Sequence, residues 1–240
     1  MNNTDANNKV SNMVKTADEV LSIIRASAMG DMCFSRILDF IQVGKTELEV
    51  AAEIERILFW LGAEKLSFPT IVVSGVRTTL PHGEPTDKVI EKGDFVTVDF
   101  GAVVDGLCAD MTRTVAMGSV TDFQREIYEL VLKAQTSALD MCKAGARCAD
   151  VDKVARDIIE AAGYGEYFVH GTGHGVGTEV HEPPKLNKES DEVLDANMPI
   201  TIEPGIYIPD KFGVRIEDLA IVTKSGIMNT VKSEKNLIIL

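Results

Sequence analysis

Apolar residues recur at helical spacing in two stretches of equal length, each of which ends at a glycine. One runs from Gly44 to Gly62 and the other from Gly145 to Gly163. In the second stretch the apolar positions share one face of a helix: Val151, Val154, Ala155, Ile158, Ile159 and Ala162. This spacing predicts an amphipathic helix, and a glycine just past the last periodic residue is a typical stop signal. We therefore predict one helix in each stretch.

A longer helix is predicted before each of these two. Three helix starts carry a Thr followed three residues later by Glu or Gln, a capping-box pattern in which the two side chains satisfy free backbone N–H groups. The pairs are Thr16 with Glu19, Thr46 with Glu49 and Thr121 with Gln124. Each half of the chain thus begins with two helices.

Segments typical of β-strands follow each pair of helices. They are residues 71–76, 95–106 and 111–118 in the first half, and residues 199–208 and 214–223 in the second. Short connections between successive strands favour an antiparallel sheet with helices on one face, an α+β fold. The repeated order predicts two similar halves, about 14–120 and 121–240, in a single domain 14–240 after a flexible tail, 1–13. Chance similarity between amphipathic helices is the alternative. A cleft is expected where the halves meet.

The charge, the apolar runs and the cysteines of the chain limit the classes of partner and the cellular setting that we expect. The 240 residues carry a formal net charge of −13, which argues against nucleic acid or an anionic membrane as the main partner. The sequence shows no secretory signal and no apolar run of about 18–20 residues, so we expect no membrane span. The four cysteines form no CxxC pair, and we interpret them as reduced and buried in a cytoplasmic protein.

Four carboxylates stand within or beside apolar strand-like runs, where an isolated charge is costly. They are Asp99, Asp110, Glu203 and Glu217, two in each half. Such a set requires compensating charge. Oxygen-rich sites suit divalent cations such as Mn²⁺, and a nearby imidazole also admits Zn²⁺, Co²⁺ or Fe²⁺. Four carboxylates exceed the needs of one catalytic zinc and suit two ions about 3.5–4 Å apart. A buried polar network without metal is the alternative.

The segment HGTGHGVGTEVHEPP, residues 170–184, holds three of the four histidines. It is not a helical HExxH zinc motif, because two prolines follow His181-Glu182. The residues alone leave three roles open for these histidines: metal ligands, catalytic acids and bases, or imidazoles on a glycine-rich loop.

Taken together, these motifs resemble the metallopeptidase family of methionine aminopeptidases, Xaa-Pro aminopeptidases and prolidases. The motifs are PHG at 81–83, VDFGAVVDGLCADMTRT at 98–114, HGTGHGVGTEVHEPP at 170–184, TIEPGIY at 201–207 and VRIED at 214–218. The resemblance covers the chain from about residue 14 to Leu240. It implies the "pita-bread" fold, whose two related halves agree with the internal repeat.

The resemblance also implies a site with two divalent metal ions, most often Mn²⁺ or Co²⁺. Its ligands would be Asp99, Asp110, His174, Glu203 and Glu217. Asp110 and Glu217 would bridge the two ions, Asp99 would complete one ligand shell, and His174 with Glu203 would complete the other. A water shared by two cations has a strongly lowered pKa and supplies hydroxide near neutral pH.

The same resemblance implies catalytic and substrate-binding roles for further residues. Glu203 would accept the proton of the water and relay it to the leaving nitrogen. His82, in a Pro-His-Gly turn, would contact the scissile region, although by itself it is typical of a surface histidine. His170 and His181 would hydrogen-bond the peptide carbonyl. Arg215 would steady Glu217 or the substrate, with a surface salt bridge as the alternative.

Details of these motifs favour the proline-specific members, because methionine aminopeptidases generally lack counterparts of His170 and Arg215. We expect an aminopeptidase that cleaves before a proline in second position. The alternatives are a prolidase, a methionine aminopeptidase, and a non-catalytic binding protein on the same fold. Most Xaa-Pro peptidases carry an extra N-terminal domain that is not seen before residue 14 here. Peptide-length preference and assembly, for which a homodimer is the candidate, stay open.

Overall fold

The computed structural model describes residues 13–240. The predicted tail, residues 1–13, lies outside the described residues except for Met13, so it stays a prediction.

Four long helices stand where the sequence predicts them. They are α2 (Ala17–Ile37), α3 (Glu47–Leu61), α4 (Asp122–Met141) and α5 (Cys148–Ala161). All three predicted capping boxes are present. In each, the Thr hydroxyl accepts a hydrogen bond from the backbone N–H of the third helical residue, and the side chain of that residue accepts one from the backbone N–H of the Thr. Gly62 ends α3 with φ of 100°, a left-handed conformation that glycine adopts without steric cost.

The strands form two groups along the chain. The first group is β1 (Ile71–Ser74), β2 (Phe95–Phe100), β3 (Val103–Val104), β4 (Leu107–Cys108) and β5 (Met111–Ala116). The second is β6 (Gly173–Gly175), β7 (Glu182–Leu186), β8 (Pro199–Ile202), β9 (Gly205–Ile208), β10 (Phe212–Arg215), β11 (Asp218–Val222) and β12 (Ile227–Asn229). The short strands β6 and β7 were not predicted.

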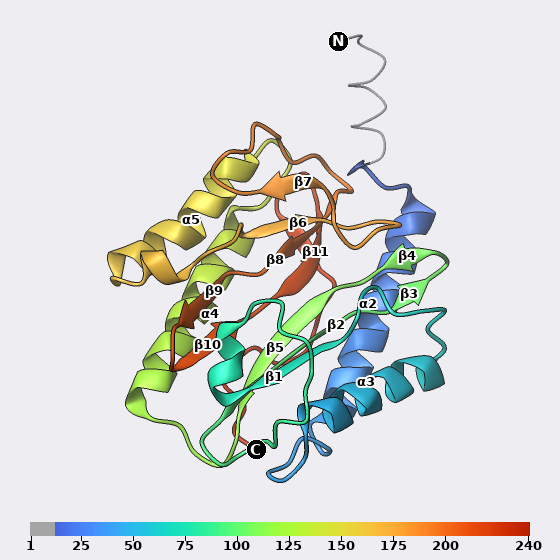
Figure 1. Cartoon of the computed structure of the whole chain (residues 1–240). Helices are drawn as coiled ribbons and strands as arrows, with labels where there is room; N and C mark the ends of the chain where they lie inside the picture. Colours follow the sequence, from blue (N-terminus) through green and yellow to red (C-terminus); the bar gives the residue numbers. More distant parts are fainter. Residues whose placement is uncertain (1–12) are drawn as a thin grey trace.

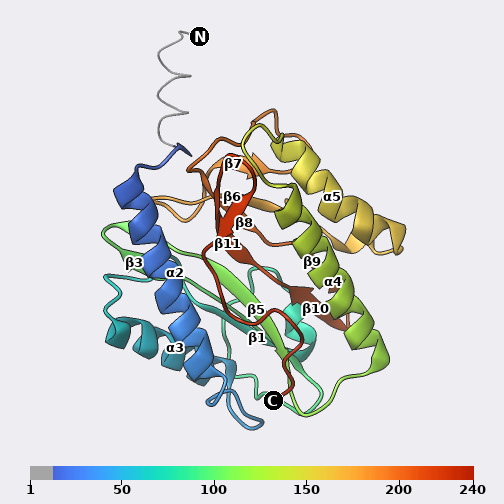
Figure 2. The ribbon, with the colours of Figure 1, turned by 180° about the vertical axis from the view of Figure 1, so that it is seen from behind.

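Every pair of neighbouring strands in these sheets is antiparallel. The larger sheets have the orders β1-β2-β5 and β12-β11-β8-β6-β7, while β9 pairs with β10 and β3 with β4. The strands lie together in the front of Figure 1, and Figure 2 shows the long helices on the opposite side. The prediction of a mostly antiparallel sheet with helices on one face is confirmed.

Two groups of buried apolar side chains join the helices to the strands. The first includes Ile23 of α2, Val50 of α3 and Val98 of β2. The second includes Val151 of α5 and Ile200 of β8. Each group thus joins the two helices of one half mainly to strands of that half, and Leu219 in the first group and Phe95 in the second come from the other half. The strands of both halves meet in the middle (Figure 1).

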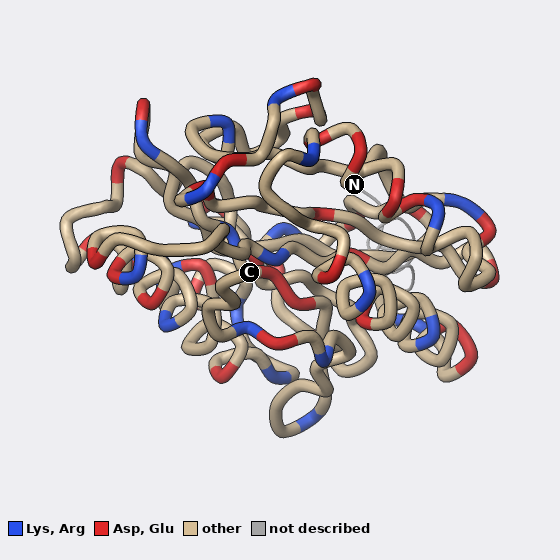
Figure 3. The backbone as a smooth tube through the Cα atoms, turned by 90° about the horizontal axis from the view of Figure 1, so that it is seen from below, with Lys and Arg blue, Asp and Glu red and all other residues tan. Residues whose placement is uncertain are grey.

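The charged residues are spread over the outer helices and loops, where Lys and Arg alternate with Asp and Glu (Figure 3). Within residues 13–240, none of the helices combines the length and apolar character needed to cross a bilayer. The four cysteines are free and buried, as predicted.

Candidate metal centre

The five predicted metal ligands line one cavity of about 250 Å³ between the two halves of the chain. Asp99 belongs to β2 and His174 to β6, whereas the other three follow the ends of strands. Asp110 lies between β4 and β5, Glu203 between β8 and β9, and Glu217 between β10 and β11. Antiparallel strands turn back at these points, which explains how residues distant in sequence meet.

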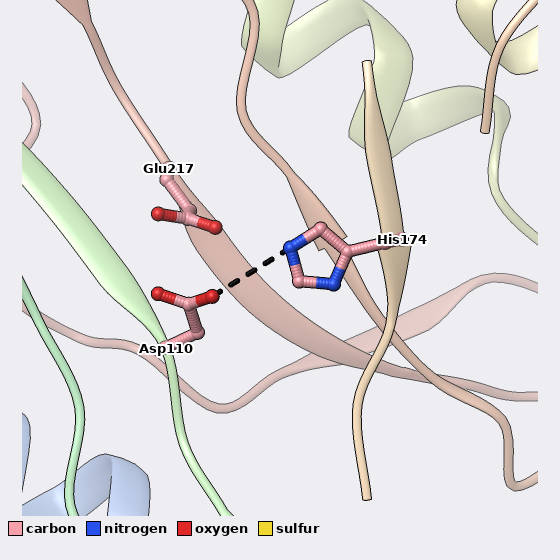
Figure 4. Close-up of side chains that lie close together, drawn as sticks. All are labelled: Asp110, His174 and Glu217. Carbon is pink, nitrogen blue, oxygen red and sulfur yellow. Dashed lines mark ion pairs between the residues drawn. The ribbon is translucent and has the colours of Figure 1, made fainter. Parts of the chain in front are cut away.

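The closest group within this cavity is formed by Asp110, His174 and Glu217. One ligand atom from each lies within 4.8 Å of the others (Figure 4). His174 Nε2 is 3.6 Å from Asp110 Oδ2 and 3.2 Å from Glu203 Oε1. The other ring nitrogen, Nδ1, lies 3.0 Å from the backbone oxygen of Gly175. An Nδ1–H that donates to this oxygen leaves Nε2 free to accept a cation.

Neighbouring polar groups hold the carboxylates in place. The Thr112 hydroxyl donates to Glu217 Oε2 over 2.7 Å, and Arg215 Nη2 donates to Asp99 Oδ2 over 2.7 Å. The hydroxyl of Thr201 donates to Glu203 Oε1 over 3.2 Å. Because each of these three carboxylates keeps one oxygen on such a partner, its other oxygen can face the cavity.

Two of these second oxygens have no protein partner. In the part of the chain that is described, the buried side-chain atoms without a hydrogen bond are Thr70 Oγ1, Asp99 Oδ1 and Glu217 Oε1. A buried carboxylate oxygen without a partner is costly in free energy. Two such atoms in one cavity fit a site that binds cations.

The electrostatics of the cavity lead to the same conclusion. Burial, followed by the charges of the neighbouring carboxylates, raises the pKa values of Asp110 and Glu217 well above their usual range. Burial also raises the pKa of Asp99, against the opposing charge of Arg215. Burial opposes ionisation of Glu203 too, but the hydrogen bond and charge of His174 outweigh it and lower the pKa of Glu203 to about 2. Ionising all four carboxylates is therefore unfavourable without added positive charge, which a bound cation would supply.

The other three histidines lie beside this site. His82, His170 and His181 line an adjoining cavity of about 370 Å³, together with His174 and Glu203. His82 is exposed in a turn, as the sequence indicated. The rings of His174 and His181 are 4.4 Å apart. The structure therefore brings together all nine predicted site residues, Arg215 included.

Arg215 contacts Asp99 directly and Glu217 only through Thr112. Its Nε donates over 3.1 Å to the Thr112 hydroxyl, which in turn donates to Glu217, and its Nη1 donates to the Tyr207 hydroxyl over 3.0 Å. That hydroxyl lies 2.8 Å from His170 Nε2. Arg215, Tyr207 and His170 thus form a hydrogen-bonded chain from a carboxylate of the metal site to the adjoining cavity.

Sequence reasoning missed Tyr207 and Thr112 as parts of the site. Both lie within the recognised motifs, Tyr207 as the last residue of TIEPGIY and Thr112 within the segment that follows Asp110. Their roles depend on cross-strand contacts, which spacing along one strand does not reveal.

A model of metallopeptidase family M24 matches residues 22–224. The chain belongs to this family. It is 45% identical over 226 residues to a curated Xaa-Pro dipeptidase of Pyrococcus furiosus, covering 94% of this chain and 65% of that protein.

Solved structures of M24 relatives have the same fold. An Xaa-Pro dipeptidase from Bacillus anthracis superposes with a TM-score of 0.95 at 48% identity, covering 97% of this chain and 65% of the other. An X-Pro aminopeptidase from Thermotoga maritima gives a TM-score of 0.95 at 40% identity, covering 98% and 67%. The predicted pita-bread fold is confirmed.

This chain spans about 65% of the length of the curated relative from P. furiosus. Membership of the M24 metallopeptidases implies a requirement for divalent metal ions, and the group formed by Asp110, His174 and Glu217 is suited to bind one.

Proposed function

We propose that this chain is a metal-dependent hydrolase of the bond between a residue and a following proline, with Xaa-Pro dipeptides as preferred substrates. The observation that carries the proposal is the cavity in which four carboxylates and His174 converge while two buried carboxylate oxygens lack protein partners. The names of the P. furiosus and B. anthracis relatives support the prolidase alternative over the aminopeptidase that the sequence favoured.

Two divalent cations fit this donor set, and Mn²⁺ is our proposal for the metal because oxygen ligands dominate. Asp99, Asp110 and Glu217 would hold one ion, and Asp110, Glu217, His174 and Glu203 would hold the other. When bound, such ions polarise a peptide carbonyl and lower the pKa of water.

The residues of the chain supply the remaining chemistry. Glu203 is ionised at neutral pH and can accept a proton and deliver it to the leaving nitrogen. His181 lines the cavity and would hydrogen-bond the peptide oxygen as negative charge develops on it. His170 lines the same cavity, and it would have to release the Gly171 oxygen or the Tyr207 hydroxyl before its ring could donate to the substrate. Burial lowers the pKa of the His170 imidazole, and partial burial together with the nearby His174 lowers that of His181. His82 would contact the scissile region from its turn.

A lysine beside the histidines favours short substrates. Lys185 of β7 pairs directly with His174 of β6, so their side chains stand on the same face of the sheet. Lys185 also lines the cavity that contains His170 and His181. A dipeptide ending in proline presents a free carboxylate within one residue of the cleaved bond. The Lys185 ammonium is placed to pair with this group, which a longer peptide lacks at that position.

An aminopeptidase acting on longer Xaa-Pro peptides is the second candidate, because the T. maritima structure has the same fold over almost the whole chain. A panel of peptides with added Mn²⁺ distinguishes the two. We expect proline release from Leu-Pro, slower cleavage of Leu-Pro-Gly, and none of Met-Ala-Ser. Cleavage of Met-Ala-Ser without cleavage of either proline peptide would refute the proposal in favour of a methionine aminopeptidase.

A homodimer is the assembly that we propose for this chain. The panel is therefore run at several protein concentrations, so that any dependence of the rate per chain on assembly is seen.

A further inference from the structure

One buried carboxylate outside the metal site holds the segment that carries His82. Glu47, the first residue of α3, is fully buried. Its Oε1 accepts hydrogen bonds from the backbone N–H and the hydroxyl of Ser74, over 2.7 and 3.0 Å. Its Oε2 accepts from the backbone N–H and the hydroxyl of Thr86, over 3.1 and 2.8 Å. Arg77 Nε adds a charged donor 3.0 Å from Oε2.

These partners enclose the His82 turn. Ser74 ends β1 and Thr86 follows the turn, so Glu47 binds the chain on both sides of His82. Arg77, between them, also donates to the backbone oxygen of Glu84 over 2.6 Å. Backbone bonds from the start of α3 to Thr86 and Lys88 continue the attachment.

None of residues 75–86 belongs to either group of buried apolar side chains, and the Gly213 N–H of β10 donates to the Thr78 hydroxyl of this segment over 2.7 Å. His82 is exposed, and it lines both cavities of the candidate site. On the side of the second half, Arg215 Nη1 donates to the Pro81 oxygen over 3.0 Å. The position of the imidazole is therefore set by hydrogen bonds to the backbone around it. Glu47 supplies two of these backbone bonds, from the N–H groups of Ser74 and Thr86, and it anchors the same segment through the two hydroxyls and Arg77.

Only a carboxylate satisfies this arrangement, because every polar group around Glu47 is a donor. A glutamine would present its NH₂ group in place of one oxygen. That group would face either the donors of Ser74 or those of Thr86 and Arg77, and at least two hydrogen bonds would be lost. Glu→Gln therefore loosens the attachment while keeping the volume of the side chain.

We propose that Glu47 is a positioning residue that holds the segment 74–86 so that His82 stands at the reacting bond. This inference rests on the proposed function, because it assumes that His82 contacts the substrate. Glu47 acts only through the turn, so its loss should lower kcat while leaving metal binding unchanged.

The test compares Glu47→Gln with a matched control, Glu55→Gln, further along the same helix. Within the described chain, no hydrogen bond joins Glu55 to residues 74–86. Misplacement of a catalytic group by about 1 Å costs on the order of 100-fold, so we expect kcat for Leu-Pro to fall about 10- to 100-fold in E47Q. We expect KM to change less than about threefold, and Mn²⁺ content to match E55Q.

A double variant separates positioning from a general structural effect. The double variant His82→Ala/Glu47→Gln should have a kcat within about twofold of that of His82→Ala alone, because the imidazole that Glu47 positions is already absent. Full multiplication of the two losses would overturn the proposal. So would an unchanged kcat in E47Q.

Amide hydrogen exchange tests the attachment without any turnover. In E47Q we expect faster exchange in residues 75–86 and unchanged exchange in β2 and β8. Unchanged exchange in residues 75–86 would overturn the proposal.

If the wild-type chain cleaves no Xaa-Pro peptide, the proposed function fails, and the exchange rates alone then decide whether Glu47 holds the segment. If E47Q does not fold, Thr86→Val leaves Glu47 in place and removes only the hydroxyl that donates to Glu47 Oε2 and accepts from the Lys88 N–H, and the same changes are expected in smaller measure.

Discussion

Replacing Lys185 by methionine should weaken cleavage of dipeptides selectively. Methionine keeps most of the length and apolar body of lysine and removes the positive charge. Because Lys185 pairs with His174 across neighbouring strands, the lost charge is close to the metal site without belonging to it. The expected effect is thus confined to substrates with a negative charge next to the cleaved bond.

The magnitude follows from the exposure of Lys185. A hydrogen bond to a charged group contributes about 1.5–3 kcal/mol, whereas an exposed ion pair contributes below about 1 kcal/mol. Lys185 is exposed at the edge of a cavity, an intermediate setting. We therefore expect a loss of about 1–2 kcal/mol, or roughly 5- to 30-fold in kcat/KM. Salt screens such a pair, so the loss should shrink as ionic strength rises.

The assay compares Leu-Pro with Leu-Pro amide, which lacks the terminal negative charge. The wild-type chain should favour Leu-Pro, and Lys185→Met should lower kcat/KM for Leu-Pro while leaving the amide nearly unaffected. Lys188→Met, at a nearby exposed position, is the matched control and should behave as wild type. An equal loss on both substrates, or no loss on either, would refute the role of Lys185 in carboxylate recognition.

Three further predictions concern the metal site and the core. In the metal-free chain the raised pKa values of Asp110 and Glu217 mean that folding takes up protons, so the free energy of unfolding falls as pH rises above about 4.5. The Tm gained on adding Mn²⁺ should consequently grow with pH in thermal scans, and a gain that falls with pH would contradict this. His82→Ala should keep its Mn²⁺, measured by elemental analysis, while its kcat falls about 100-fold, and Glu203→Ala should abolish turnover. Loss of metal in the His82 variant would contradict the assignment of His82 as a substrate-contacting residue rather than a metal ligand. Burial raises the pKa of the Cys33, Cys142 and Cys148 thiols to about 12, so a thiol reagent should label these three only after denaturation, and rapid labelling of the native chain would show that the packing is wrong.

The helices were predictable because their signals are local. A capping box such as Thr46 with Glu49 is complete within four residues, and the left-handed Gly62 is fixed by the chain next to it. The sequence also singled out the four carboxylates that converge in the candidate metal site, because a charge within an apolar strand conflicts with its surroundings. Asp99, within a strand whose six residues are all buried, is the clearest example.

The missed features depend on contacts between distant residues. β6 contains two glycines and β7 contains two prolines, and both residue types have low intrinsic strand preference. These strands form because β6 pairs with β8 on one side and with β7 on the other. Glu47 resembles any acidic residue in the first turn of a helix, and its role appears only when Ser74 and Thr86 are placed around it. Arg215 was expected to steady Glu217 or the substrate, and its direct bond to Asp99 on β2 was not foreseen.

The most direct test of the proposed function is proline release from Leu-Pro by chelator-stripped protein as Mn²⁺ is titrated in. The metal-free protein should be inactive, and the rate should rise to a plateau at two ions per chain. Proline release that does not depend on Mn²⁺, or no release at any Mn²⁺ concentration, would contradict a metal-dependent Xaa-Pro hydrolase.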